Sequence, residues 1–199
     1  MDIPASLVKQ LRDQTGAGMM ECKAALQEAN GNLEEANTIL RKRGLAQAAK
    51  KAGRSASEGQ IAAYIHTGGK VGVLVEVNCE SDFVARTDDF QNLMKELALQ
   101  VAAASPTYAR RDDVPADVLE RERGIYRAQM ESSGKPASVI EKIVEGKLGS
   151  FYEQLVLVDQ PSIRDPKVTV GQLIQAAIAK LGENISVARF VRFKVGEGR

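Results

Sequence analysis

The chain has 199 residues and a formal net charge of +1, from 27 basic and 26 acidic side chains. This balance argues against nucleic acid as the main partner, because phosphate binding depends on a large cationic excess. Hydrophobic residues make up 44% of the chain and aromatic residues only 5%, which is typical of an ordinary globular protein and not of one that stacks on bases.

Cysteine usage and hydropathy indicate the compartment. Two cysteines, Cys22 and Cys79, are too few for a disulfide framework, and both lie in segments with apolar periodicity, so we expect two buried thiols. The first ten residues contain no apolar signal core. The longest apolar runs are far shorter than a membrane span. We therefore expect a cytoplasmic protein that does not bind a membrane.

The first 45 residues are predicted to form a compact domain of three short helices. The helical spacing of apolar residues places these helices over 6–15, 19–29 and 32–44. Glycines at 16 and 18 separate the first two helices, and Asn32 is suited to cap the third. Gly44 follows a basic last turn and is predicted to end the third helix.

Residues 46–59 are rich in Ala, Lys, Gly and Ser and are interpreted as a linker. The basic side chains between Arg41 and Arg54 are interpreted as a solvated helix face, with a local basic binding patch as the alternative.

Residues 60–199 are predicted to form an α+β core domain around an antiparallel sheet. The elements are a β-hairpin over 60–78, helices over 88–104, 118–132, 139–148 and 170–181, and strands over 155–158 and 185–195. The hairpin turns at 67–70, where glycines permit positive φ. The two middle helices, within about 116–148, are predicted to form a projecting helical hairpin with a thin apolar seam at Val118, Ile125 and Ala128.

Enzymatic chemistry is disfavoured. The one histidine, His66, lies at a hairpin turn, and no motif places a serine or cysteine to use it. The cysteines and the histidine lack a metal-ligand spacing, and there is no phosphate-binding glycine loop. We therefore expect no active site, no cofactor and no metal, with an enzyme that uses His66 as the weaker alternative.

The segment Ser81-Asp82-Phe83-Val84 directly follows an apolar strand, where binding residues are commonly found. An aromatic ring beside a carboxylate at this place could insert into a partner. The alternative is that Phe83 packs in the core while Asp82 caps the next turn.

A second candidate is the bend 15–20, which carries Met19 and Met20. Met19 shares a face with Cys22 and Leu26, and adjacent residues of a helix point in different directions, so we expect one methionine to be exposed. Flexible methionines suit partner surfaces. The alternative is a loosely packed domain edge.

These segments together resemble the elongation factor Ts family. The resemblance lies in residues 7–12, 15–20, 22–26, 29–32, 75–85, 133–136, 144–146, 160–161, 169–173 and 193–197, and so covers nearly the whole chain. It implies a ubiquitin-associated-like (UBA-like) three-helix domain at 1–45, a linker at 46–59 and a core domain at 60–199.

The resemblance also implies a function and a set of site residues. The family comprises translation elongation factors that bind elongation factor Tu in its GDP form and promote GDP release. Carried over, Asp82 and Phe83 would enter the partner beside its magnesium and phosphate site, with Ser81 and Val84 flanking them; the family usually has Thr at the position of Ser81. Arg12, Met19 and Met20 match positions that touch the partner's nucleotide-binding domain, and His66 matches a position near its third domain.

This chain has one copy of the core subdomain, where longer family members carry two. It therefore resembles the short form, whose members are thought to act as two subunits, and a homodimer and a monomer both stay open. So does the question of whether the hairpin at 116–148 meets the partner or a second subunit. The competing interpretation is a plain binding module, in which the three-helix domain binds a peptide, ubiquitin or nucleic acid.

Overall fold

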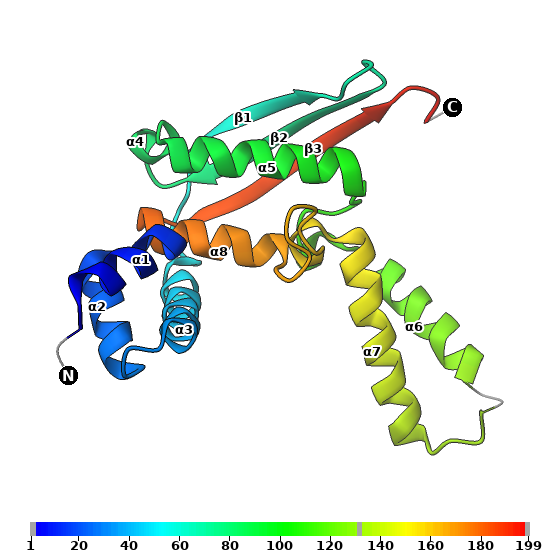
Figure 1. The fold of residues 1–199 in the computed structure, drawn as a ribbon. Helices are drawn as coiled ribbons and strands as arrows, with labels where there is room; N and C mark the ends of the chain where they lie inside the picture. The colour runs from blue at the N-terminus through cyan, green and yellow to red at the C-terminus, as the bar shows by residue number, and fades with distance from the viewer. Residues whose placement is uncertain (1–2, 131–132, 198–199) are drawn as a thin grey trace. The chain divides into compact units, whose positions relative to one another are not determined.

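The computed structural model describes residues 3–130 and 133–197 (Figure 1). The chain divides into two compact units. The first comprises the described residues up to Ile61 together with Glu76–Lys95 and Gln172–Val187, and the second comprises Ala62–Val75, Glu96–Gly171 and the described residues from Ala188 onward. Helices and an antiparallel three-stranded sheet are combined in one chain, so the predicted α+β class is confirmed.

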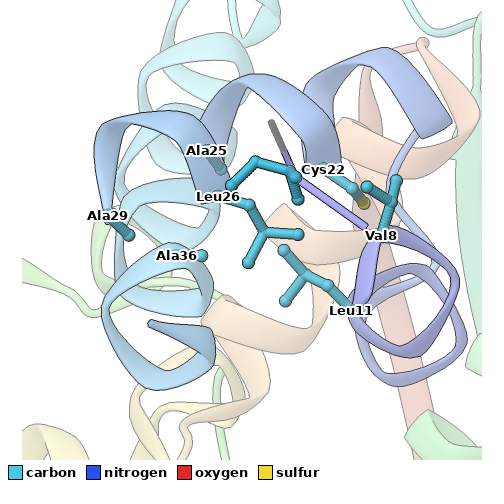
Figure 2. Packing of buried hydrophobic residues seen from close by; sticks show 8 residues of the cluster. Val8, Leu11, Cys22, Ala25, Leu26, Ala29 and Ala36 are labelled. Atoms are coloured by element: carbon cyan, nitrogen blue, oxygen red, sulfur yellow. The ribbon is translucent and has the colours of Figure 1, made fainter. Parts of the chain in front are cut away.

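Three helices open the first unit: α1 (Ala5–Thr15), α2 (Met19–Glu28) and α3 (Leu33–Lys51). They enclose a small core, part of which is drawn in Figure 2. Its buried members are Ile3, Val8, Leu11, Cys22, Ala25, Leu26, Ala29 and Ala36. The predicted UBA-like three-helix domain is thus confirmed, and Cys22 is one of its buried side chains.

The ends of these helices follow the predicted capping residues. Gly16 ends α1 with a φ of 68°, and its N–H donates to the carbonyl of Arg12 at 2.7 Å. Asn32 caps α3, because its Oδ1 accepts from the backbone N–H groups of Glu34 and Glu35 at 3.0 and 3.2 Å. Such caps satisfy donors that the first turn of a helix leaves unpaired.

The predicted end of the third helix at Gly44 is wrong, because α3 continues to Lys51. Gly44 lies in the middle of the helix, where a Cβ would come within 3.3 Å of the Cβ of Ala179. This glycine therefore permits close packing of α3 against α8 (Val170–Leu181) instead of ending a helix. The domain boundaries at 45 and 59 stay a prediction.

The sheet consists of β1 (Glu58–Ile65), β2 (Val71–Cys79) and β3 (Ile185–Lys194) in the order β1-β2-β3. β1 and β2 form the predicted hairpin, whose turn is closed by a hydrogen bond from the N–H of His66 to the carbonyl of Val71 at 2.9 Å. Alternate residues of β2 are buried on one face, as the period of a strand requires. Those on this face include Val73, Val75, Val77 and Cys79.

The helix α5 (Asp88–Ala104) has the predicted bounds. Its apolar positions are all buried: Phe90, Leu93, Met94, Leu97 and Val101. In the first unit Gln91 Nε2 donates to Gln60 Oε1 at 2.6 Å. In the second unit Arg192 Nε donates to the carbonyl of Ala102 at 3.2 Å.

In the second unit, α6 (Ala116–Met130) and α7 (Ala137–Leu155) form the predicted helical hairpin. The predicted apolar seam is partly wrong, because Ile125 and Ala128 are exposed while Val118 is half-buried. Charged pairs link the two helices, including the one between Arg127 and Glu141 at 2.7 Å. Ser132, the predicted end of the first of these helices, lies outside the described residues.

The strand predicted over 155–158 is also wrong. α7 extends to Leu155, and a short 3-10 helix, η3 (Leu157–Asp159), follows. The apolar run belongs to a buried cluster in which Val156 forms a single parallel bridge with Tyr108. A short apolar run does not by itself distinguish a buried helix end from a strand.

Candidate functional site

The first candidate, Ser81 to Val84, forms a tight turn at the end of β2. Ser81 is the N-cap of the short helix α4 (Asp82–Ala85), and its Oγ accepts from the backbone N–H of Val84 at 3.4 Å. Val84 and Ala85 are buried beneath this turn. Buried residues on one side of a single helical turn direct the other side outward.

Phe83 occupies that outward side, and 77% of its surface is exposed. The alternative in which Phe83 packs in the core is therefore wrong. Aromatic side chains are highly buried on average in folded chains, so an exposed ring at a turn keeps this residue a candidate contact residue.

Asp82, beside Phe83, does not cap the turn, since Ser81 does. Its carboxylate instead pairs with Arg86 Nη2 at 2.6 Å, one helical turn later. Both side chains are mostly exposed, and an exposed ion pair of this kind contributes little free energy. Asp82 can therefore exchange Arg86 for another positive group at small cost.

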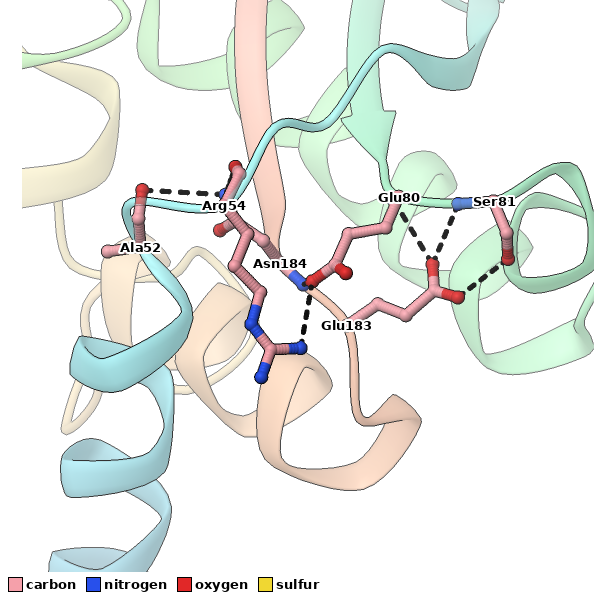
Figure 3. A network of polar contacts seen from close by, with 6 residues as sticks. All are labelled: Ala52, Arg54, Glu80, Ser81, Glu183 and Asn184. Carbon is pink, nitrogen blue, oxygen red and sulfur yellow. Dashed lines mark hydrogen bonds and ion pairs between the residues drawn. The ribbon is translucent and has the colours of Figure 1, made fainter.

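The turn is supported from below by a polar network in the first unit (Figure 3). Glu183, between α8 and β3, accepts hydrogen bonds from the backbone and hydroxyl of Ser81. Its neighbour Asn184 donates from Nδ2 to the carbonyl of Arg54 at 2.8 Å. Sequence reasoning missed Glu183 and Asn184, because two polar residues between Gly182, which ends a helix, and a strand indicate only a connecting loop.

Cys79 lies at the base of the same turn, and its Sγ donates to the carbonyl of Ser81 at 3.1 Å. Burial raises the pKa of this thiol above its ordinary value of 9.0, and the nearby negative charge of Glu183 raises the pKa further. Cys79 is thus a neutral structural thiol, as the sequence predicts for a buried cysteine.

The second candidate group, Arg12, Met19 and Met20, lies in the same unit as the Ser81 turn. Arg12 is exposed near the end of α1. Met19 and Met20 open α2 and are 45% and 76% exposed, so the expected exposed methionine is found, and the other methionine is exposed as well. Both thioethers are available to a partner surface.

Lys180 on α8 lies next to the bend that presents the methionines. A Cβ on Gly16 would meet Lys180 Cε at 3.1 Å, and Lys180 Nζ pairs with Asp89 of α5 at 2.7 Å. The bend between α1 and α2 is therefore packed against an ion pair that involves the first turn of α5.

His66 belongs to the second unit, where it follows β1 at the hairpin turn. Its Nδ1 lies 2.9 Å from the hydroxyl of Tyr64, and the ring is exposed. A hydroxyl of tyrosine at the edge of the ring orients the imidazole but does not provide a nucleophile–base pair.

The structure thus groups Arg12, the methionines and the Ser81 turn in one unit, with His66 in the other.

One face of the sheet in the second unit is also open and apolar. The hydrogen bonds from His66 N–H to the Val71 carbonyl and from Val195 N–H to the Lys70 carbonyl, both 2.9 Å, set the register. This register places Ile65, Gly72 and Phe193 side by side across the strands. Ile65 and Phe193 are 67% and 69% exposed, and a Cβ at Gly72 would meet Ile65 Cδ1 at 3.1 Å. The exposed apolar residues of this face, here called the open sheet face, are Ile65, Leu74, Val191, Phe193 and Val195.

Among residues 3–130 and 133–197, no cluster of three or more His, Cys, Asp and Glu side chains could hold a metal ion. In the same described ranges, no helix is long and apolar enough to cross a membrane.

The chain is similar to known proteins over nearly its whole length. The family model described as Elongation factor TS matches residues 5–197. Elongation factor Ts of Carboxydothermus hydrogenoformans is 58% identical over 196 residues, which cover 98% of this chain and 90% of the relative. Those of Fervidobacterium nodosum and Coprothermobacter proteolyticus are 59% and 60% identical over 197 residues, which cover 99% of this chain and the whole of each relative.

Proposed function

Because the chain belongs to the elongation factor Ts family, it is a translation elongation factor, and we propose that it exchanges guanine nucleotide on elongation factor Tu through Asp82 and Phe83. The observation that carries the residue assignment is the exposed Phe83 ring on a turn whose other side is buried. A ring held in this way can enter a partner without first unfolding the turn that bears it.

The chemistry of exchange follows from what holds a nucleotide in a GTPase. Magnesium and the phosphates hold the switch loops together. Displacing the magnesium ion, or the protein groups that contact the phosphates, therefore weakens the binding of the diphosphate. Phe83 wedged between elements of the partner shifts the groups around the phosphates. Asp82, once released from Arg86, brings a negative charge toward the partner's magnesium. Neither action requires a covalent step, so the protein needs no active site of its own.

Thermodynamic linkage then drives the cycle. The protein binds the nucleotide-free state of elongation factor Tu better than the loaded state. It therefore lowers the affinity of elongation factor Tu for GDP, and GDP lowers the affinity of elongation factor Tu for the protein by the same factor. Binding of GTP displaces the protein in turn. Arg12, Met19 and Met20 provide the contact with the nucleotide-binding domain, where the exposed thioethers adapt to the partner surface. His66, oriented by Tyr64, provides a contact with the third domain.

The test is release of a fluorescent GDP analogue from elongation factor Tu, followed by stopped flow with and without this protein. Acceleration that depends on Phe83 supports the proposal. Equal release rates with and without the protein would contradict it.

The open sheet face supports a second proposal, that two copies of the chain form a homodimer. An antiparallel sheet with helices on one side usually has a polar opposite face, whereas this face is apolar. A two-fold axis through the face would pair Phe193 and Leu74 with the same residues of the second copy. The single core copy in this chain would then be matched by a second copy in the dimer.

A further inference from the structure

We propose that Glu183 is a positioning residue for nucleotide exchange, which holds the turn that presents Phe83. Glu183 lies beyond the site residues that the family resemblance identifies, and its side chain is half-buried. The inference rests on the function proposed above.

Glu183 binds the turn with both carboxylate oxygens (Figure 3). Its Oε2 accepts from the backbone N–H groups of Glu80 and Ser81, at 3.1 and 3.0 Å. Its Oε1 accepts from the hydroxyl of Ser81 at 2.6 Å. Hydrogen bonds to an ionised carboxylate are shorter and stronger than neutral ones, and three of them converge here on one side chain.

Ser81 transmits this anchoring to α4. Its hydroxyl donates to Glu183 and at the same time accepts from the backbone N–H of Val84, as the cap of the helix. Phe83 is the second residue of that helix, and Val84 beneath it is buried. The backbone of Phe83 is therefore held through Ser81 on one side and through the buried Val84 on the other.

The anchor is itself held in place. The backbone N–H of Asn184 donates to Glu80 Oε1 at 2.6 Å, so the end of β2 and the turn after α8 each provide a side chain that binds the other's backbone. Arg54 Nη1 lies 3.6 Å from the same Glu80 oxygen. Gly182 permits the reversal before Glu183 with a φ of 80°.

A turn that is ordered before binding avoids the entropy cost of ordering at the moment of binding. Loss of the anchor should therefore weaken exchange without changing the residues that touch the partner. The loss should also depend on Phe83, because Phe83 is the side chain that the anchor positions.

A double-mutant cycle tests this dependence. Glu183→Gln keeps the shape, but its amide nitrogen cannot accept, so at least one of the three donors loses its partner. We expect Glu183→Gln to lower the exchange efficiency about tenfold, and by about twofold or less when Phe83 is already Ala. The readout is stopped-flow release of fluorescent GDP from elongation factor Tu over a range of concentrations. Glu28→Gln, which breaks the ion pair with Arg43 in the same unit, is the matched control and should retain the wild-type rate.

Ser81→Ala provides a second route, since it removes the 2.6 Å bond and leaves Glu183 in place. It should lower exchange in the same Phe83-dependent way, and the amides of residues 80–84 should exchange with deuterium faster in both variants. Equal losses with and without Phe83, or a wild-type rate in Glu183→Gln while Phe83→Ala is slow, would overturn the positioning role alone. A wild-type rate in Phe83→Ala would overturn the proposed function, and this inference with it.

Discussion

Gly44 of α3 faces Ala179 of α8 so closely that a Cβ on the glycine would lie 3.3 Å from the Cβ of the alanine. A glycine inside a helix costs about 0.5–1 kcal/mol relative to alanine. The close approach of the two helices explains why a glycine is found there, since any longer side chain would push α3 away from α8.

We expect Gly44→Gln to destabilise the protein by about 1–3 kcal/mol, as over-packing does at a close contact. The matched control is Gly124→Gln in α6, where the added Cβ would meet nothing within 4 Å beyond its own helix backbone and adjacent residues. The control should be neutral or stabilising, because glutamine is a good helix former. Thermal unfolding followed by circular dichroism measures both, and an equal change in melting temperature would contradict the packing role of Gly44.

The three-helix core depends on few side chains. Leu11 is completely buried in it, so Leu11→Ala should cost about 2–5 kcal/mol. A core this small has little stability in reserve, and the variant should lose the protection of α1 to α3 against hydrogen exchange. Leu45→Ala, at a partly exposed position of α3, should leave that protection intact. Unchanged protection in Leu11→Ala would show that the helices do not depend on this core.

Cys79 makes the stability of the fold depend on pH. Because burial and Glu183 raise its pKa in the folded state above 9.0, the neutral thiol stabilises the fold at neutral pH. That stabilisation is complete below the pKa of the unfolded thiol and is lost as pH rises through the folded pKa. Wild-type stability should therefore decline more steeply above pH 9.0 than that of Cys79→Ala. Denaturant unfolding at several pH values checks this, and parallel declines would contradict it.

The open sheet face predicts an assembly. Phe193→Glu places a charge on this face and should convert a dimer into a monomer in sedimentation velocity, because burying an unpaired carboxylate is costly. Ile163→Glu changes another exposed hydrophobic residue, which lies outside the sheet, and should leave the dimer unchanged. A wild-type protein that sediments as a monomer at micromolar concentration would contradict the homodimer.

Predictions from the sequence succeeded where local signals decide the structure. Asn32 and Gly16 act as caps because their effect depends on only a few neighbouring residues. The predictions failed where a contact between residues far apart in the sequence decides the local structure. Gly44 looks like a helix end until α8 is placed beside it. Leu155 belongs to a helix although its apolar neighbours resemble a strand.

The candidate site shows the same division. The position of Phe83 at a strand end was visible in the sequence, but its exposure depends on the burial of Val84 and Ala85. The role of Glu183 depends on its contact with Ser81, which lies 102 positions earlier in the chain. No local pattern contains that contact.

The most direct test of the account is the release of fluorescent GDP from elongation factor Tu with wild-type protein, Phe83→Ala and Ile163→Ala. We expect wild-type protein and Ile163→Ala to accelerate release equally, and Phe83→Ala to lose about tenfold or more of that acceleration, as the loss of a central aromatic contact does. A folded Phe83→Ala variant that accelerates release as well as the wild type would contradict the claim that this ring opens the nucleotide site.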